Sequence, residues 1–506
     1  MTLPAITLSQ WQVSPVNRKE QRDEFSSALE RIRVLGSVFQ TIYEWFGSPG
    51  IGKSTLLRLL IEDCHNANAS YAFINFKDKS YPQAETSFEK GEVDATRLIE
   101  DLINGLSDAD SLKVKQAIKT YRSIPADEKE RANKQLKHSD VARAFVRFVG
   151  DVSKHDPVVM LFDETESADP ELVAWLEEWI VNPLIQNGRC LIVWAGRRPQ
   201  RWKRFEVRRR LRSQELGLFD AKGTVELFES NSKYPLTELS DPVRRLTLGH
   251  PFADVVALRR LDTLAKEGRI PQRDQFSSIE TDLIDGLVQD FVEKYAFKGL
   301  SKELANSCRI LALVRQFDVI LLREILTDAL PSSYDNYKRE EFGGLLSRLR
   351  ATQLVWWDDR RKGYALDLTL RHILGENIRR HQPKVYAKVN QVAIGVYRDW
   401  IERAGDNRGI YIVEELYQQA CLNLISEEDH PLKKTPLPVL LEQRLREYPQ
   451  RDPDLRASAL DRLYHELEDD LDIPRLIGQD SRDRLLKLVR RERIHAYDIL
   501  KNESSS

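Results

Sequence analysis

A nine-residue segment, GSPGIGKST from Gly47 to Thr55, places the strongest constraint on the fold of this chain. It satisfies the pattern GxxxxGK[ST], in which the backbone N–H groups of a glycine-containing loop surround phosphate oxygens. An apolar stretch, 41–46, precedes the segment, and LLRLLIEDC follows it with apolar residues three to four positions apart. The order of strand, glycine loop and helix therefore predicts an anion-binding loop at the N-terminus of a helix.

The pattern gives each residue of this loop a predicted role. We expect the β- and γ-phosphates of ATP or ADP to be bound by Gly47, Ser48, Pro49, Gly50, Ile51, Gly52, Lys53, Ser54 and Thr55. The Lys53 ammonium should pair with the phosphate oxygens, and the Ser54 hydroxyl should ligate Mg²⁺. A chance glycine turn is the alternative, which the strand and helix on either side disfavour.

An apolar run that ends in two carboxylates, VVMLFDE, occupies 158–164. A continuous apolar run is typical of a strand that is buried on both faces of a parallel sheet. We expect Asp163 to face the glycine loop from the neighbouring strand and to bind Mg²⁺, while Glu164 polarises the attacking water. Glu164 could instead cap the next helix, and Glu166 and Asp169 are rival bases.

A further apolar run, CLIVWA at 190–195, is followed by Gly196, Arg197 and Arg198. In a parallel sheet this strand should lie beside the acidic strand, which would place a guanidinium near the γ-phosphate. We assign that catalytic or sensing role to Arg197. A solvated arginine at a strand end is the alternative reading.

Strand and helix patterns alternate through the first part of the chain. Helical patterns separate strand-like runs at 41–46, 71–76, 158–163 and 190–195. Such alternation predicts an α/β P-loop NTPase fold with a parallel sheet. After about residue 215 the patterns become helical, with a break at LGHPFAD and a polar connector at 267–278.

The remainder of the chain changes pattern twice. Three helices, a two-stranded hairpin (QLVWW and YALDL) and another helix describe a winged helix, and from 383 onward the pattern is helical. Four parts are therefore predicted: an ATPase α/β domain (1–215), a helical lid with connector (216–278), a winged-helix domain (279–381) and an all-α C-terminal region for sensing or partner docking (382–506).

Composition excludes several classes of protein. The 77 Lys and Arg against 79 Asp and Glu give a net charge of −2, so the chain is not a generally basic nucleic-acid binder. No apolar run is long enough to span a membrane, and the N-terminus lacks a signal-peptide pattern, which predicts a soluble, cytoplasmic protein. The four cysteines lack metal or disulfide-framework spacing and are expected to be buried thiols.

One strongly basic segment stands out against this neutral average. Between Arg197 and Arg212, nine basic residues and one acid give a local net charge of +8, with Trp202 and Phe205 interleaved. Three interpretations remain open: an ion-paired or solvated surface, arginines that sense phosphate or reach a neighbouring subunit, and a nucleic-acid contact.

The order of these motifs resembles a known group of proteins. The NRKEQ start, GSPGIGKST, the acidic strand, the strand end VWAGR and the LGHPFAD break resemble the STAND ATPases, which are related to NACHT and NB-ARC proteins. They also resemble the AAA+ ATPases of the origin-recognition type. The resemblance covers about residues 13 to 380, and the phosphate loop with its acidic pair is its most specific part.

The resemblance implies further site residues. Asn17 and Arg18 would lie near the adenine, and Gly249, His250 and Pro251 would form a lid turn against the nucleotide. In such proteins ADP holds a closed state and ATP permits self-association. This chain departs from a common Met-His-Asp motif, because it has Ala365, Leu366 and Asp367 at that place, so the usual histidine contact to ADP is missing.

The sequence therefore predicts a Mg²⁺-dependent ATPase that acts as a molecular switch in signalling or defence. We expect a homo-oligomer in the ATP state and output through a partner protein. The alternative is a DNA-binding AAA+ regulator of replication or transposition type, which would use the basic segment and the winged helix.

Overall fold

The computed structural model describes residues 14–16, 18–78, 96–106, 119, 134–186, 188–269, 272–403, 407–425, 434–447 and 453–503. The chain divides into two compact units, Met1–Asp262 and Thr263–Ser506. Each unit is described separately below. The finer four-part division stays a prediction.

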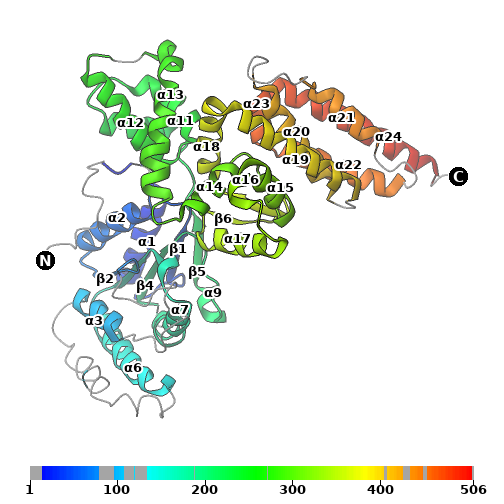
Figure 1. Cartoon of the computed structure of the whole chain (residues 1–506). Helices are drawn as coiled ribbons and strands as arrows, with labels where there is room; N and C mark the ends of the chain where they lie inside the picture. The colour runs from blue at the N-terminus through cyan, green and yellow to red at the C-terminus, as the bar shows by residue number, and fades with distance from the viewer. Residues whose placement is uncertain are drawn as a thin grey trace. The chain divides into compact units, whose positions relative to one another are not determined.

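A five-stranded parallel sheet forms the centre of the first unit (Figure 1). Its strands are β1 (Ile42–Phe46), β2 (Ser70–Asn75), β3 (Val158–Asp163), β4 (Cys190–Gly196) and β5 (Leu211–Glu215). Their spatial order is β2-β3-β4-β1-β5. The order confirms that the acidic strand β3 lies beside β4. It corrects the expectation that β3 is the neighbour of the strand before the glycine loop, because β4 lies between β3 and β1.

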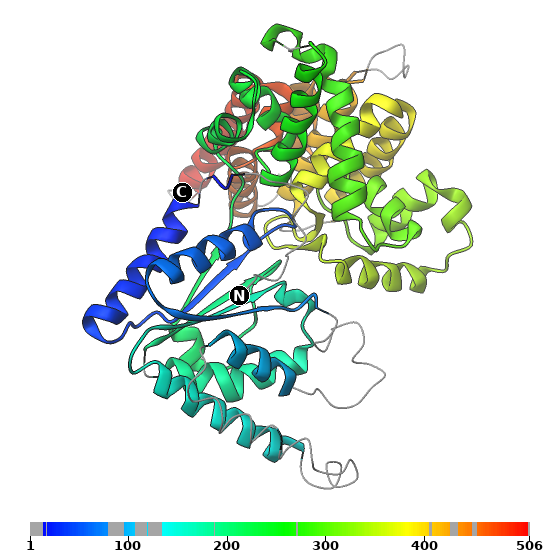
Figure 2. The same cartoon turned by 90° about the vertical axis from the view of Figure 1, so that its left-hand side faces the viewer.

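Helices cover both faces of this sheet, as the two views in Figures 1 and 2 show. One face carries α1 (Lys19–Leu35) and α2 (Lys53–Asn66), and the other carries α3 (Thr96–Gly105), α6 (Lys134–Val152), α7 (Pro170–Leu176) and α8 (Asn182–Ile185). Between α7 and α8 lies a π-helical turn, Glu177–Val181. A short helix, α9 (Phe205–Arg209), leads into β5.

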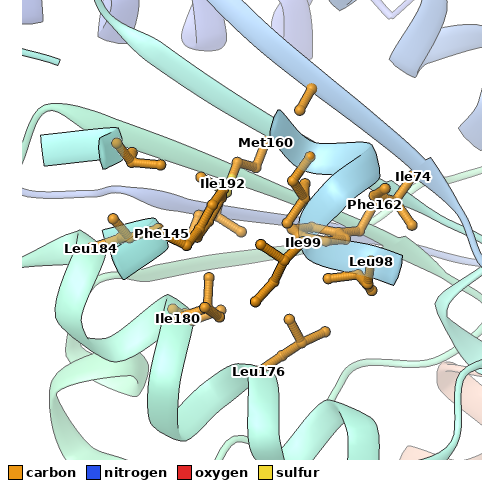
Figure 3. Packing of buried hydrophobic residues seen from close by; sticks show 14 of the residues in the cluster. Ile74, Leu98, Ile99, Phe145, Met160, Phe162, Leu176, Ile180, Leu184 and Ile192 are labelled. Atoms are coloured by element: carbon orange, nitrogen blue, oxygen red, sulfur yellow. The ribbon is translucent and has the colours of Figure 1, made fainter. Parts of the chain in front are cut away.

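The core alternates with the two-residue period of the strands. In β3, Met160 and Phe162 pack toward α3 and α6, together with Ile192 of β4 (Figure 3). Val159 and Leu161 belong to the opposite core, under α1 and α2. Burial on both faces explains why these strands have continuous apolar sequences.

Three α-helices follow β5: α10 (Ala221–Asn231), α11 (Ser240–Thr247) and α12 (Pro251–Lys266), and the boundary between the units falls within the last turn of α12. Asp220 begins α10 by accepting a hydrogen bond from the backbone N–H of Gly223. The turn between α11 and α12 contains Leu248 and Gly249, both with positive φ. This turn is the break predicted at LGHPFAD.

The second unit begins with helices and one hairpin. Its elements up to residue 381 are α13 (Phe276–Leu287), a π-helical turn (Val288–Ala296), α14 (Lys302–Leu311), α15 (Val319–Ala329), α16 (Pro331–Tyr334), α17 (Arg339–Ala351), β6 (Val355–Asp358), β7 (Gly363–Leu366) and α18 (Leu368–His381). The strands β6 and β7 pair in antiparallel fashion. The predicted order of three long helices, hairpin and helix is thus observed.

Only helices occur in the described residues after 381. They are α19 (Pro383–Arg403), α20 (Arg408–Asn423), α21 (Leu437–Arg446), α22 (Pro453–Glu468), α23 (Asp472–Ile477) and α24 (Gln479–Glu503). Their apolar faces share a core that includes Ile412, Leu416, Leu460 and Leu485. The predicted fold class, a parallel α/β domain followed by helices with one hairpin and then by helices alone, is confirmed.

Two further observations concern cysteines and membranes. Cys64, Cys190, Cys308 and Cys421 are buried and unpaired, as expected. Among the described helices, none combines the length and the apolar character that crossing a bilayer requires.

Candidate nucleotide-binding site

The glycine loop connects β1 to α2 at the carboxyl edge of the sheet. Gly52 has a φ of 98°, a conformation that favours glycine, and it directly precedes the first residue of α2. The Lys53 ammonium lies 2.7 Å from the Gly47 carbonyl oxygen and 3.0 Å from that of Ser48. Lys53 therefore folds back over a loop whose shape suits a phosphate group.

The Lys53 side chain is buried, with 7% of its surface exposed. Burial lowers its pKa, although the nearby carboxylates Glu166 and Glu164 oppose that effect. A buried ammonium whose charge is not fully balanced attracts an anion. The loop, the helix N-terminus and this ammonium thus favour the same ligand, a phosphate.

Asp163 ends β3 and is fully buried. Its Oδ1 accepts a hydrogen bond from the Glu164 backbone N–H at 2.9 Å, whereas its Oδ2 has no hydrogen-bond partner among the described residues. Burial and the charge of Glu164 raise the pKa of Asp163 to about 6, and the Ser54 hydroxyl counteracts that rise by hydrogen bonding. A buried carboxylate oxygen beside a hydroxyl is a fitting pair of ligands for Mg²⁺.

Two ion pairs extend this edge of the sheet. Lys77, two residues after β2, places its Nζ 2.7 Å from Glu164 Oε1. Arg197, directly after β4, places its Nε 2.9 Å from Glu166 Oε1 and donates its backbone N–H to the same carboxylate. Two carboxylates that follow β3 are therefore each held by a cation from an adjacent strand.

The pKa values of the two glutamates are shifted in opposite directions. Burial acts to raise the pKa of Glu164, but the pairing with Lys77 lowers it overall. Burial and the charge of Glu164 raise the pKa of Glu166 to about 7, and Arg197 only partly opposes the rise. At neutral pH, Glu164 is therefore the ionised member and the better candidate for a base.

The other predicted base has a structural function. Asp169 is fully buried and accepts hydrogen bonds from the backbone N–H groups of Glu171 and Leu172, which begin α7. That pattern is the N-cap of a helix, followed by Pro170 in the first turn. Asp169 is therefore a capping residue. Glu164 was predicted as a possible cap, but its side chain accepts no capping hydrogen bond, and its backbone is left-handed with a φ of 53°.

The lid turn contacts the glycine loop directly. His250 Nε2 lies 3.0 Å from the Pro49 carbonyl oxygen, and the His250 side chain is fully buried. Gly249 has a φ of 78°, and its carbonyl accepts a hydrogen bond from the Phe219 backbone N–H at 2.7 Å. A Cβ at Gly249 would lie 2.3 Å from the Phe219 carbonyl oxygen, so only glycine permits this close approach. Pro251 begins α12.

Arg18 joins the loop to the segment after β5. Its Nη2 donates to the carbonyl oxygens of Ile51 at 2.8 Å and Gly217 at 2.9 Å. Its guanidinium also lies 5.5 Å from the centre of the Phe219 ring. Burial lowers the pKa of Arg18 to about 10. Asn17, predicted beside it, lies outside the described residues.

The structure thus brings together most of the predicted site. The loop, Ser54, Asp163, Glu164, Arg197, Arg18 and His250 all border one edge of the first unit. Sequence reasoning missed Lys77 and Phe219. Lys77 follows a predicted strand by two positions, so its place at the carboxyl edge of the sheet was a usable signal.

No protein-family model matches the chain, and no curated protein shows a significant match. The first unit is a parallel α/β domain with a glycine loop at the carboxyl edge of its sheet.

Among solved structures, the chain is similar to the ORC2 protein of Aeropyrum pernix, described in ADPNP–ADP complexes. That structure has 16% identity and a TM-score of 0.41, over 73% of this chain and 96% of that one. Cdc6p of Pyrobaculum aerophilum has 13% identity and a TM-score of 0.36, over 72% and 97%.

A Pyrococcus horikoshii STAND protein with a tetratricopeptide repeat sensor has 14% identity and a TM-score of 0.29, over 95% of this chain and 65% of that one. The matches therefore include both groups that the sequence resembles.

Proposed function

We propose that this protein is a Mg²⁺-dependent ATPase in which the bound nucleotide acts as a switch. The observation that supports this most directly is the meeting of Lys53 and Ser54, at the start of α2, with Asp163 at the end of β3. These groups supply a cation for phosphate oxygens and two oxygen ligands for a divalent cation. Bound Mg²⁺ would neutralise charge on the β- and γ-phosphates.

Hydrolysis would depend on residues that follow β3 and β4. Glu164 is the carboxylate that would orient and polarise the attacking water, because pairing with Lys77 keeps it ionised. Arg197 would stabilise charge near the γ-phosphate, and Glu166 fixes its position. We expect slow hydrolysis, because the base and the arginine are both engaged in ion pairs.

The switch would act through the lid. His250 connects the lid turn to the glycine loop, and Arg18 connects the same loop to the segment that carries Phe219. A phosphate that repositions the loop would therefore also move α12. We propose that this change permits self-association and engages a partner protein in signalling or defence. The winged-helix region (279–381) would move with the lid, and the C-terminal helices (382–506) would sense a ligand or bind the partner.

The contacts of the hairpin do not favour the alternative, a DNA-binding regulator. Arg360 contacts Glu466, and Arg361 contacts Asp358 and Glu414, so both arginines of the hairpin turn are used within the second unit. On α17, Arg348 pairs with Glu303. Because these three arginines are already paired, they are poorly prepared to bind the phosphates of DNA.

Nucleotide titration of the full chain tests this proposal. With a fluorescent ATP analogue and Mg²⁺, we expect saturable binding that Lys53→Ala weakens at least tenfold. Lys154→Ala is the matched control, because Lys154 is an exposed lysine that pairs with Asp151 near the end of α6. Equal affinity in the Lys53 variant and the parent protein would disprove the site.

Mass photometry tests the switch separately from the site. The full chain is measured with ADP and then with a slowly hydrolysed ATP analogue, and we expect a larger assembly only with the analogue. An unchanged mass, in a protein that binds both nucleotides, would reject self-association while leaving the ATPase proposal intact.

A further inference from the structure

Seven of the nine basic residues in the segment 197–212 form two groups in the structure. One group is paired internally: Arg197 with Glu166, Arg204 with Glu178, Arg209 with Glu206, and Arg212 with Glu24. Glu206 already belongs to the segment, so the three further acids, Glu166, Glu178 and Glu24, reduce its net charge from +8 to +5. The other group, Arg201, Lys203 and Arg208, is exposed, and no ion pair is found for it among the described residues.

The backbone that carries this exposed group is held by two buried glutamates. Glu44 of β1 is 1% exposed and accepts hydrogen bonds from the Gln200 backbone N–H at 2.8 Å and from Trp202 Nε1 at 3.3 Å. Glu177 is 3% exposed and accepts from the backbone N–H groups of Lys203 and Arg204 at 2.7 and 2.6 Å. Charge-assisted bonds of this kind fix the start of α9 firmly.

Apolar anchors complete this support. Trp202 is 5% exposed and packs against Trp194 at a ring distance of 5.2 Å, and Val207 is fully buried. Phe205, between these anchors, is 65% exposed instead. We call Arg201, Lys203, Phe205 and Arg208 the α9 platform; α9 precedes the edge strand β5 (Figure 1).

A second exposed aromatic ring lies near this platform. Phe39 is 52% exposed, and the guanidinium groups of Arg209 and Arg210 lie 5.2 and 5.4 Å from its ring centre. Arg209 is one helical turn from Phe205 on α9, which places the two on the same side of that helix. Two exposed aromatic rings, Phe39 and Phe205, thus accompany the cations of this segment.

We propose that the α9 platform binds single-stranded nucleic acid. Three unneutralised cations suit a phosphate backbone, and an exposed phenylalanine among them offers a face on which an unpaired base can stack. A protein partner would instead need a wider apolar patch to exclude water. Duplex DNA hides its base faces, so stacking on Phe205 favours a single strand.

The binding experiment uses the full chain and a fluorescein-labelled 20-nucleotide oligo(dT). We expect Arg201→Ala/Lys203→Ala/Arg208→Ala to weaken binding at least tenfold at about 50 mM salt and to reduce the slope of log K against log salt by about 2. The control triple variant, Arg31→Ala/Arg147→Ala/Lys266→Ala, removes the same charge from exposed residues elsewhere and should bind as the parent does.

A substitution series at Phe205 separates stacking from simple apolar contact. Phe205→Leu should weaken oligo(dT) binding about tenfold with an unchanged salt slope, and Phe205→Trp should restore it, because only an aromatic ring stacks on a base. A 20-base-pair duplex and poly-L-glutamate of equal charge serve as competitors, and both should compete weakly.

Four results would overturn the proposal. These are absence of oligo(dT) binding at about 50 mM salt, equal loss in the control triple variant, full binding by Phe205→Leu, and competition by poly-L-glutamate as strong as by unlabelled oligo(dT). The last would identify the platform as a site for an acidic protein segment. None of these results depends on ATP binding, so the outcome is independent of the nucleotide site.

Discussion

Lys77 Nζ and Glu164 Oε1 lie 2.7 Å apart at the carboxyl ends of two neighbouring strands, β2 and β3. On the other side of β3, Arg197 pairs with Glu166 at 2.9 Å. The two glutamates are only two residues apart, yet Lys77 lowers the pKa of one, while burial raises the pKa of the other to about 7. We therefore expect Glu164 to be the base and Glu166 to position Arg197.

The first prediction distinguishes these roles. Glu164→Gln should lower the kcat of ATP hydrolysis at least 100-fold while nucleotide affinity stays within a few-fold, because the variant keeps the shape but loses the base. Glu166→Gln should lower kcat only about tenfold, because a neutral amide resembles the protonated carboxyl present near neutral pH. Single-turnover hydrolysis measures both. If Glu166→Gln is the more damaging variant, the base is Glu166.

The second prediction concerns His250, which connects the lid turn to the Pro49 carbonyl. His250→Ala should weaken nucleotide binding about tenfold and destabilise the protein by about 2 kcal/mol, because a fully buried ring and its hydrogen bond are both lost. Titration with a fluorescent ADP and chemical denaturation measure the two effects. The control is His65→Ala, which removes a histidine that bonds Tyr71 on an exposed part of the same unit. Full nucleotide affinity in His250→Ala would show that the contact between the lid turn and the glycine loop does not contribute to nucleotide binding.

The third prediction concerns the pH dependence of the lid. Asp254 is fully buried, accepts hydrogen bonds from the Thr224 and Thr247 hydroxyls, and has its pKa raised by burial to about 7. Because the folded state favours the protonated form, this group's contribution to stability is fully present below about pH 4 and is lost as the pH rises to 7. The side chain of Asp254→Asn cannot ionise, so this variant should not lose stability at this position as the pH rises.

Chemical denaturation of the full chain at pH 5 and pH 8 tests this behaviour. The free energy of unfolding of Asp254→Asn, relative to that of the parent protein, should be larger at pH 8 than at pH 5 by about 1–3 kcal/mol. Asp241→Asn is the control, since Asp241 pairs with Arg245 on the exposed side of α11. A difference that does not change with pH would show that Asp254 is already ionised at pH 5 in the folded state.

Local chemistry explains how much of the fold and site could be predicted. The strands β3 and β4 are buried on both faces, so their apolar runs identified them. The edge strand β5, with the sequence LRSQE, was missed because most of its side chains are exposed and its extended form comes from pairing with β1. The position of β4 between β1 and β3 was also missed, since an apolar run is the same for any order of buried strands.

The site shows the same division between local and distant information. Lys53, Ser54 and the glycines belong to one short motif, so their roles could be predicted from spacing alone. The pairing of Lys77 with Glu164 joins residues far apart in the sequence, and the choice between Glu164 and Glu166 depends on such partners. Asp169 was misread as a rival base because an aspartate can serve as either a helix cap or a base. Only the backbone N–H groups around it show which of the two it is.

In the second unit, a buried group of charges joins the hairpin region to the C-terminal helices. Arg315 is fully buried and donates to Glu414 at 2.9 and 3.0 Å and to Asp470 at 2.5 Å. Its guanidinium lies 4.1 Å from the centre of the Tyr417 ring. Burial acts to lower the pKa of Arg315, but the surrounding carboxylates raise it overall, so the arginine stays charged.

The fourth prediction follows from that arrangement. Arg315→Met should destabilise the second unit by about 3–5 kcal/mol, because it leaves Glu414 and Asp470 buried without their cation. Arg323→Met is the matched control and should cost less than about 0.5 kcal/mol, since Arg323 is half-exposed and pairs with its neighbour Glu324. Differential scanning calorimetry of the full chain measures both. Because Arg315 lies before position 382 and its partners Glu414 and Asp470 lie after it, the hairpin region and the C-terminal helices should unfold in one transition. Two separate transitions in the parent protein, one unaffected by Arg315→Met, would show instead that these parts fold independently.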